Sequence, residues 1–463
     1  MRAQCVALSV ASVAACVLPA AARAQGFGLN EIGSCAIGRG FAVTAATCDD
    51  ASAMFWNPAA TTELPGVSIY AGGASVAVTG DFTEDLTRRE YEGDVPVEFP
   101  PHFFASYHPS PRVALGLGVY VPYGLTSQWK RDFPGRFLAR KASLATIYAQ
   151  PNLAFELVPG KFSIGGGPVI GRSHVQLIQG LDLAEQRLPT GATFAQIGIP
   201  RGTEFGEATL EGDAIAVGYN VGVKWNATPK LQLGARFLSK LNFEFQEADA
   251  TFRQTPTNLT LAGALPPAIP AGTRVDPLLA QQFVRGALVE QKVQTAIEHP
   301  AQAQVGLGYT LGQSTTVSVD YAWIGWHVFR ALPVRFLGAA SAQNRVILEE
   351  YDDAHSVRAG LEHRVFDAIP LRAGYAFTKT PAPDVTVTPL LPDQDRNNYM
   401  LGFGLPISRY MLDFAYLKVD TDGRRGRVVE RTPENDELPA EQLNTGFYRL
   451  DANVFSLSLR AQF

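Results

Sequence analysis

Charged side chains are scarce in this sequence: Asp, Glu, Lys and Arg make up 18% of its 463 residues, against 46% for the hydrophobic types. When residues 1–24 are left out of the count, the chain has 37 basic and 44 acidic side chains, a net charge of −7. This acidic balance argues against nucleic acid as a partner. The 43 Gly and 31 Pro fit many turns and half-apolar strands better than a helical core.

Long apolar runs are also missing after the N-terminus. No later stretch reaches the ~18 residues that a transmembrane helix needs. Any part that spans a membrane must therefore be a closed β-barrel, since only helices and closed barrels satisfy every backbone hydrogen bond in lipid.

Catalytic motifs are missing as well. The sequence has no G-x-S-x-G elbow, no H-E-x-x-H pair, no Walker A loop and no Cys/His cluster. The seven His are scattered, and we interpret them as solvated or lumen-facing side chains. We expect neither an enzyme nor a cofactor.

The N-terminus is typical of a secretory signal peptide over residues 1–24. It has a basic Arg2, a mostly apolar run from Val6 to Leu18 and the small-x-small cleavage site Ala22-Arg23-Ala24. Cleavage there would leave Gln25 first. Lipoprotein processing at Cys16 is the alternative, because the preceding residues are similar to a lipobox.

Cysteine is rare, and two of the four residues leave with the leader. Cys35 and Cys48 remain. In an exported protein such a pair most simply forms a disulfide, with two free thiols as the alternative. No His or further Cys lies nearby, so we expect no metal site.

Segments with period-two alternation run from Val67 to the last residue. In the last one, five apolar residues from Phe455 to Phe463 alternate with Ser456, Ser458, Arg460 and Gln462. This pattern fits a strand between lipid and a polar lumen. About fourteen such segments can be counted, at 67–79, 97–108, 112–124, 146–158, 161–178, 207–228, 230–253, 289–311, 313–338, 344–365, 367–380, 394–406, 409–422 and 444–463. We therefore predict an all-β fold, an antiparallel transmembrane β-barrel over residues 65–463.

Residues 25–64 fit neither a regular strand nor a long helix. They are rich in Gly and Ala, which suit backbone packed in a restricted space, and Asn57-Pro58 is a turn or helix-start signal. We predict that this segment is a plug inside the barrel.

Several motifs together resemble the outer-membrane long-chain fatty acid transporter family of the FadL/TodX type. In the N-terminal segment they are Gly26, Phe27, Leu29 and Asn30; Gly38 to Gly40; Asp49 to Ser52; and Asn57, Pro58 and Ala59. Downstream they are Trp323, Trp326 and Phe329; Leu371 to Phe377; and Leu391 to Arg396. The resemblance implies a fourteen-stranded barrel, an N-terminal hatch, and a monomer in the outer membrane.

The resemblance also implies a ligand groove between two long links, 179–206 and 254–288. Each link contains a candidate amphipathic helix, one over Leu181 to Leu188 and one starting at Asp276-Pro277. Leu279 and Phe283 would line the groove. The alternative is that these helices simply cover the barrel mouth.

Three arginines are predicted to point inward, namely Arg236, Arg358 and Arg372. They would hold a fatty acid carboxylate by charge-assisted hydrogen bonds. The alternative is a salt-bridged lumen with Glu156, Asp320, Glu362 and Asp413 as candidate partners. Only Arg372 falls in a motif shared with the family. We interpret the LPDQDR motif at Leu391 to Arg396 as a structural loop end.

The third predicted strand carries Gly116, Gly118, Pro122 and Gly124. A Pro with clustered Gly predicts a break in the ladder, with ordinary curvature as the alternative. The resemblance implies a kink here that opens the wall sideways.

These observations predict passive uptake of a hydrophobic molecule, most simply a long-chain fatty acid, through a plugged barrel into the outer-membrane lipid. Arrival of the ligand would shift the segment around Phe27 and open a path toward the third strand. An uptake channel for aromatic hydrocarbons is the first alternative. A general diffusion porin or a structural outer-membrane protein is the second.

Overall fold

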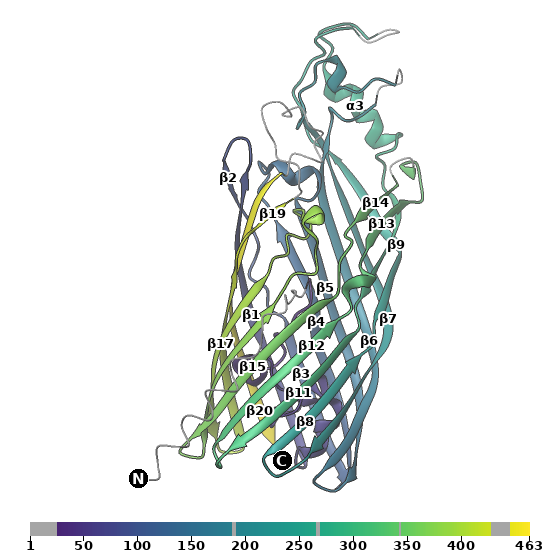
Figure 1. The fold of residues 1–463 in the computed structure, drawn as a ribbon. Helices are drawn as coiled ribbons and strands as arrows, with labels where there is room; N and C mark the ends of the chain where they lie inside the picture. Colours follow the sequence, from purple (N-terminus) through teal and green to yellow (C-terminus); the bar gives the residue numbers. More distant parts are fainter. Residues whose placement is uncertain (1–25, 188–190, 265–268, 342–343, 427–444) are drawn as a thin grey trace.

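A computed structural model describes the chain except for residues 1–25, 188–190, 265–268, 342–343 and 427–444. The predicted signal peptide, its cleavage before Gln25 and the alternative lipid site at Cys16 therefore lie outside the described residues. Figure 1 shows a tall barrel of tilted strands, with α3 (Val275–Val284) at the end opposite the C-terminus.

The barrel wall is a closed antiparallel ring of fourteen wall strands, which confirms the predicted fold. Closure comes from β1 and β20, which pair along their whole length. In order, the wall strands are β1 (Val67–Glu84), β3 (Pro101–Ser110), β4 (Val113–Gln128), β5 (Lys141–Val158), β6 (Phe162–Asp182), β7 (Glu204–Asn226), β8 with β9 (Leu231–Leu238 and Leu241–Gln254), β10 with β11 (Gln291–His299 and Gln302–Leu311), β12 with β13 (Thr315–Ile324 and Ala331–Phe336), β14 with β15 (Arg345–Leu348 and Ala354–Val365), β16 (Ile369–Thr378), β17 (Arg396–Ile407), β18 (Tyr410–Thr421) and β20 (Gly446–Gln462). Two short strands, β2 (Glu90–Glu92) and β19 (Arg424–Gly426), extend the ladder beside β1 and β20.

Four neighbouring wall strands are interrupted part-way along. Each was predicted as one segment, but β8/β9, β10/β11, β12/β13 and β14/β15 are pairs separated by a break. Pro300 lies in the second break, where a residue without an N–H cannot donate to the ladder. The third break contains the 3₁₀ turn η4 (Trp326–Val328).

The two faces of the wall differ as the alternation predicts. In β20, Phe455, Leu457 and Leu459 are exposed on the outside, whereas Ser456 and Ser458 are buried on the inside. Both serines lie within hydrogen-bond distance of the Ser34 hydroxyl of the N-terminal segment, at 2.8 and 2.7 Å. No helix of the described ranges is long and apolar enough to cross a membrane.

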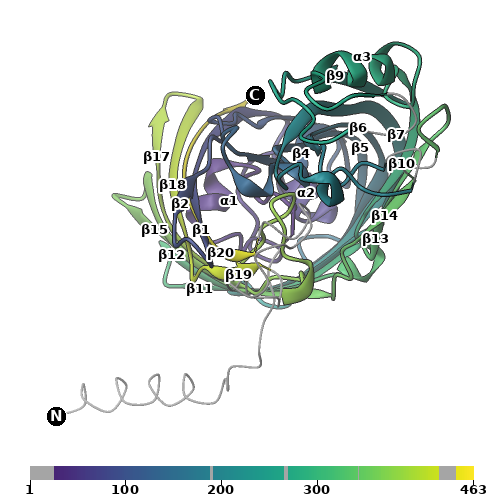
Figure 2. The ribbon, with the colours of Figure 1, turned by 90° about the horizontal axis from the view of Figure 1, so that it is seen from above.

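Residues 26–64, which we call the hatch, lie inside the ring, as Figure 2 shows. The hatch contains the short helices α1 (Ser34–Gly38) and α2 (Ala53–Trp56) and the 3₁₀ helix η1 (Pro58–Glu63). Most of its side chains are buried. Gly40 has φ 63°, and a Cβ there would lie 2.4 Å from the carbonyl oxygen of Ala359, so only glycine lets the hatch approach the wall this closely.

Further 3₁₀ turns lie in the links between wall strands, namely η2 (Pro134–Phe137), η3 (Ala195–Ile197) and η6 (Asp384–Thr386). The helix predicted from Asp276-Pro277 is present as α3. The helix predicted over Leu181 to Leu188 is wrong for residues 181–187, and Leu188 lies outside the described residues. There β6 continues to Asp182, because Leu181 stays paired with Gly206 in a long hairpin with β7, and turns follow it.

Candidate ligand site

The wall has a gap on one edge of β4. Pairing between β3 and β4 ends at His102 and Tyr120, and the β4–β5 register shifts between Tyr120 and Tyr123. Pro122 sits in this shift and has no N–H for the ladder. The next pairing with the preceding segment is the bridge between Gly93 and Trp129, just past the end of β4.

Of the four residues predicted for the opening, Pro122 and Gly124 lie at this gap. Gly116 and Gly118 lie farther toward the start of β4. A Cβ at Gly116 would be 2.6 Å from the methyl group of Met54, and one at Gly118 would be 3.2 Å from its sulfur. The absence of a side chain at these two positions therefore leaves room for Met54 of the hatch, and the two glycines do not line the gap.

The start of the hatch fills the gap by pairing with β4. The Leu29 amide donates to the Pro122 carbonyl oxygen at 2.8 Å, and the Gly124 amide donates to the Phe27 carbonyl oxygen at 3.0 Å. Gly28 and Tyr123 form an antiparallel bridge between these two bonds. The hatch thus supplies the backbone neighbour that β4 lacks here.

The Phe27 ring is held in a cage of aromatic side chains and is 3% exposed. Its ring centroid lies 4.5 Å from Trp326, 5.3 Å from Phe329, 5.7 Å from His299 and 6.1 Å from Tyr123, all in edge-on contacts. Trp326 and Phe329 come from the break between β12 and β13, and His299 ends β10 at another break. The interruptions of the wall therefore build the cage.

Two pockets meet at Phe27. The larger has a volume of about 400 Å³ and the smaller about 90 Å³, and both are lined mainly by apolar side chains. Four residues line both pockets and so separate them: Phe27, Leu125, Ser143 and Leu144. The larger pocket also touches Phe99 and Ile147, which are exposed on the outer surface, so it extends from the hatch into the wall.

One cation lines the larger pocket beside Phe27. Arg396 donates from Nη2 to the Gly26 carbonyl oxygen at 3.2 Å and forms a 2.9 Å ion pair with Asp393. Glu31 of the hatch lines the same pocket, and burial raises the pKa of its carboxyl. Sequence reasoning missed Arg396 as a ligand residue, although it ends the LPDQDR motif; the loop before it folds into the barrel, where Pro392, Asp393 and Gln394 also line the pocket.

Comparisons with known proteins agree with this architecture. The family described as outer membrane protein transport protein (OMPP1/FadL/TodX) matches residues 15–463. This chain belongs to that family. The crystal structure of a Pseudomonas aeruginosa FadL homologue superposes with a TM-score of 0.77 at 20% identity, covering 95% of this chain and 100% of the other.

Two further relatives differ in what their names say they transport. The long-chain fatty acid transport protein of Escherichia coli O6:H1 is 22% identical over 399 residues, 84% of this chain and 85% of that protein. The Ralstonia pickettii toluene transporter TbuX has a TM-score of 0.63 at 18% identity, covering 95% of this chain and 100% of that one. The predictions of the family, the outer membrane and the transport of hydrophobic compounds are confirmed.

The three predicted arginines of this FadL/TodX family member face the hatch rather than the two pockets. Arg372 is bound by Glu362 at 2.8 Å and Asp413 at 2.5 Å. Arg236 lies over the ring of Phe55 at 4.1 Å, and Arg358 is buried with its guanidinium 5.9 Å from the ring centroids of Phe41 and Trp56. Their part in binding a carboxylate stays a prediction.

Asn57, Pro58 and Ala59 fasten the hatch to the wall. The Asn57 amide donates to the carbonyl oxygens of Thr44 at 2.8 Å and Val223 at 3.0 Å, and its oxygen accepts from the Ala59 amide. All three residues are buried, so this contact suits an anchor better than a moving part.

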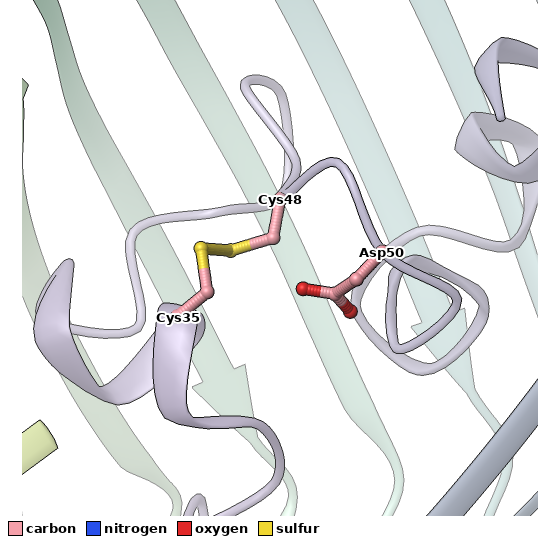
Figure 3. A group of neighbouring side chains, drawn as sticks. All are labelled: Cys35, Cys48 and Asp50. Atoms are coloured by element: carbon pink, nitrogen blue, oxygen red, sulfur yellow. A yellow bond between two sulfur atoms is a disulfide. The ribbon is translucent and has the colours of Figure 1, made fainter. Parts of the chain in front are cut away.

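A disulfide between Cys35 and Cys48 closes the hatch onto itself across 13 residues. Figure 3 shows it beside the carboxylate of Asp50. Asp50 is buried and accepts hydrogen bonds from the amide of Ser52 at 2.8 Å and its hydroxyl at 2.5 Å, while burial raises its pKa to about 6. Ligand atoms of the three residues lie within 4.8 Å of one another, but disulfide sulfurs are not thiolates and so are poor metal ligands.

The two long links that were predicted to form a groove pack against each other. Leu279 is 7% exposed in a cluster with Leu183 and Phe205, and the ring of Phe283 lies 6.0 Å from that of Phe205. Both residues thus face into the space between the links. Their contact with a ligand stays a prediction, and it would require Phe283 to part from Phe205.

Proposed function

We propose that this transporter carries long-chain fatty acids passively through the barrel and releases them sideways, through the gap beside β4. The observation that supports this path is the pairing of Phe27 and Leu29 with that edge of β4. A wall sealed by a short, separate segment opens when the segment moves, whereas a continuous ladder does not. The outer links 179–206 and 254–288 would take up the cargo first.

Phe27 is the moving part in this proposal. Its ring separates the two pockets, so its withdrawal from the cage would join them into one apolar space that reaches the wall. A ligand drives such a shift only if it binds the displaced state more tightly. A hydrocarbon chain meets this condition, because it buries more apolar surface in the joined space than in either pocket alone.

A carboxylate would couple to the hatch through Arg396. The guanidinium now donates to the Gly26 carbonyl, beside Phe27. A fatty acid carboxylate is a stronger acceptor than a peptide carbonyl and would compete for this donor. Binding of the head group would thus weaken a contact that holds the start of the hatch.

An aromatic hydrocarbon is the second candidate cargo. It is favoured by the apolar, ring-lined surroundings of Phe27, and it needs no cation. Arg396 tilts the proposal toward the fatty acid, because its guanidinium can donate charge-assisted hydrogen bonds to a carboxylate, whereas a hydrocarbon has no acceptor for them.

A reversible lock tests the gate. Gly28 and Tyr123 form a non-hydrogen-bonded antiparallel pair, in which Cα atoms lie about 4.5 Å apart, within the range of a disulfide. We expect the double variant Gly28→Cys, Tyr123→Cys to lose oleate uptake when oxidised and to regain it on reduction. Each single variant, and the unmodified protein with the same reductant, are the controls. Equal uptake by the oxidised and reduced double variant would rule out this gate.

A further inference from the structure

Another apolar cavity lies on the outer, membrane-facing side of the barrel. It has a volume of about 1050 Å³ and crosses β1, β20, β18, β17 and β16. Gly73 and Ser75 of β1 form its floor, because their side chains are small. Large apolar residues rise on either side of them: Phe99, Pro101, Phe455 and Leu457. We call this cavity the outer groove.

From the outer groove, the outward face of β1 continues through Ala71 and Ile69 to Val67 at the start of the strand. Ala71, Gly73 and Ser75 pair directly with Leu459, Leu457 and Phe455, and directly paired residues share one face of a sheet. From Ser75 to Val67 the strand covers eight residues, about 27 Å at ~3.4 Å each. With a tilt of about 40° this is roughly 20 Å along the membrane normal, which is long enough to cross one leaflet, about 15 Å of a ~30 Å core.

Arg409 places a positive charge near the start of β1. Arg409 lies in the short turn between β17 and β18, and short turns mark the periplasmic side. Its guanidinium lies 5.1 Å from the ring centroid of Phe463 and 5.6 Å from that of Tyr410. Phe463 in turn is hydrogen-bonded to Val67 at the start of β1. Arg409 is exposed, and it has no ion pair among the residues that the structure describes.

The position of the outer groove decides what can fill it. It is continuous with the apolar outer face of the barrel, where hydrocarbon replaces water. An empty void there would leave its lining without dispersion contacts. A phospholipid brings both an acyl chain for the groove and a phosphate for a free arginine at the interface.

We propose that the outer groove and Arg409 bind one phospholipid of the periplasmic leaflet, with its phosphate at Arg409 and an acyl chain along β1. The chain reaches Phe99 and Pro101, which also line the larger pocket inside the barrel. The bound lipid therefore supports the irregular wall segment that borders the gap of β4.

Native mass spectrometry of the detergent-purified barrel, incubated with phosphatidylethanolamine, tests this site. We expect the wild type to retain one lipid, and Arg409→Gln to retain about fivefold less, as one interfacial arginine contributes. Ser75→Leu fills the floor and should lower retention at least as much. Arg112→Gln, in another short turn, and Ala359→Leu, on the outer face of β15, are matched controls that should retain lipid like the wild type.

Two further probes separate the parts of the site. Diacylglycerol lacks the phosphate, so its retention should fall in Ser75→Leu and not in Arg409→Gln. Oleate should leave the retained phospholipid in place, because the fatty acid binds inside the barrel. Equal phospholipid retention by all five proteins, a diacylglycerol loss in Arg409→Gln, or displacement of the phospholipid by oleate would each overturn the proposal.

Discussion

The amide of Gly124 donates a hydrogen bond of 3.0 Å to the carbonyl oxygen of Phe27, across the gap in the wall. This bond and its neighbour at Leu29 satisfy backbone groups of β4 that would otherwise lack partners. Unpaired backbone groups in a water-poor wall are costly, so the closed state is stable until a ligand compensates for their loss. The hatch is therefore part of the wall as well as a filling of the lumen.

Removing the Phe27 side chain should loosen this closure. Phe27→Ala takes a buried ring out of a cage of aromatic side chains, a change that typically costs about 3 kcal/mol or more. Amide exchange at Leu29 and Gly124 should then be about 100-fold faster. Hydrogen exchange measures this directly. Phe205→Ala, in the cluster of the outer links, should leave both amides unchanged, and an unchanged rate in Phe27→Ala would refute the role of the cage.

Arg396 should discriminate between cargo head groups. Arg396→Gln removes a charged donor whose hydrogen bonds contribute roughly 1.5–3 kcal/mol, so oleate should bind at least ~10-fold more weakly. Oleyl alcohol, which has the same chain without the charge, should bind almost as before. Arg140→Gln, which breaks an ion pair with Glu207 away from both pockets, is the control. Isothermal titration that finds equal losses for both ligands would remove Arg396 from the head-group site.

Arg372 should matter for stability rather than for cargo. Arg372→Gln leaves the carboxylates of Glu362 and Asp413 buried without their cation, which typically costs about 3–5 kcal/mol. The barrel should therefore unfold at a lower temperature, as seen by heat-dependent gel migration. Lys292→Gln, the control, breaks an exposed ion pair with Asp249, worth about 1 kcal/mol or less. Weaker oleate binding at unchanged stability would instead support the carboxylate role predicted from the sequence.

The sequence predicted the wall well because each strand carries its own pattern. Phe455 and Ser456 differ in polarity whatever their neighbours are, so the faces of β20 follow from β20 alone. The breaks at Pro300 and Gly325 could not be predicted as a cage. The side chains at these breaks contact Phe27, which lies nearly 300 residues away in the sequence, and no local pattern predicts such a contact.

For the polar residues of the site, the sequence likewise predicted local features but not tertiary contacts. Arg372 was correctly predicted to point inward, but its partners depend on register, which places Glu362 directly opposite it. Arg396 was set aside as part of a loop end. Only the inward fold of the preceding loop brings it to Gly26, and this is a tertiary contact.

The disulfide should stabilise the hatch and not the wall. In the chain-entropy description, a closed loop of this length contributes about 3 kcal/mol. Cys35→Ser with Cys48→Ser should therefore speed amide exchange in α1 and raise cleavage of the hatch by added protease. Strands such as β6 and β7 should exchange as in the wild type. If the hatch is equally protected in the double variant, packing against the wall holds it without the crosslink.

Asp50 should make the stability of the hatch depend on pH. Burial raises its pKa from 3.8 to about 6, so the folded hatch holds a proton that the released segment gives up. The stability from this proton is complete below about pH 4 and is lost as pH rises through about 6. A shift of about two units corresponds to roughly 3 kcal/mol. Asp50→Asn keeps the oxygen that accepts from Ser52 and removes the charge. We expect it to slow hatch exchange at pH 7.5 and to have little effect at pH 4. Faster exchange of the variant at pH 7.5 would show that the folded hatch stabilises the Asp50 carboxylate and lowers its pKa instead.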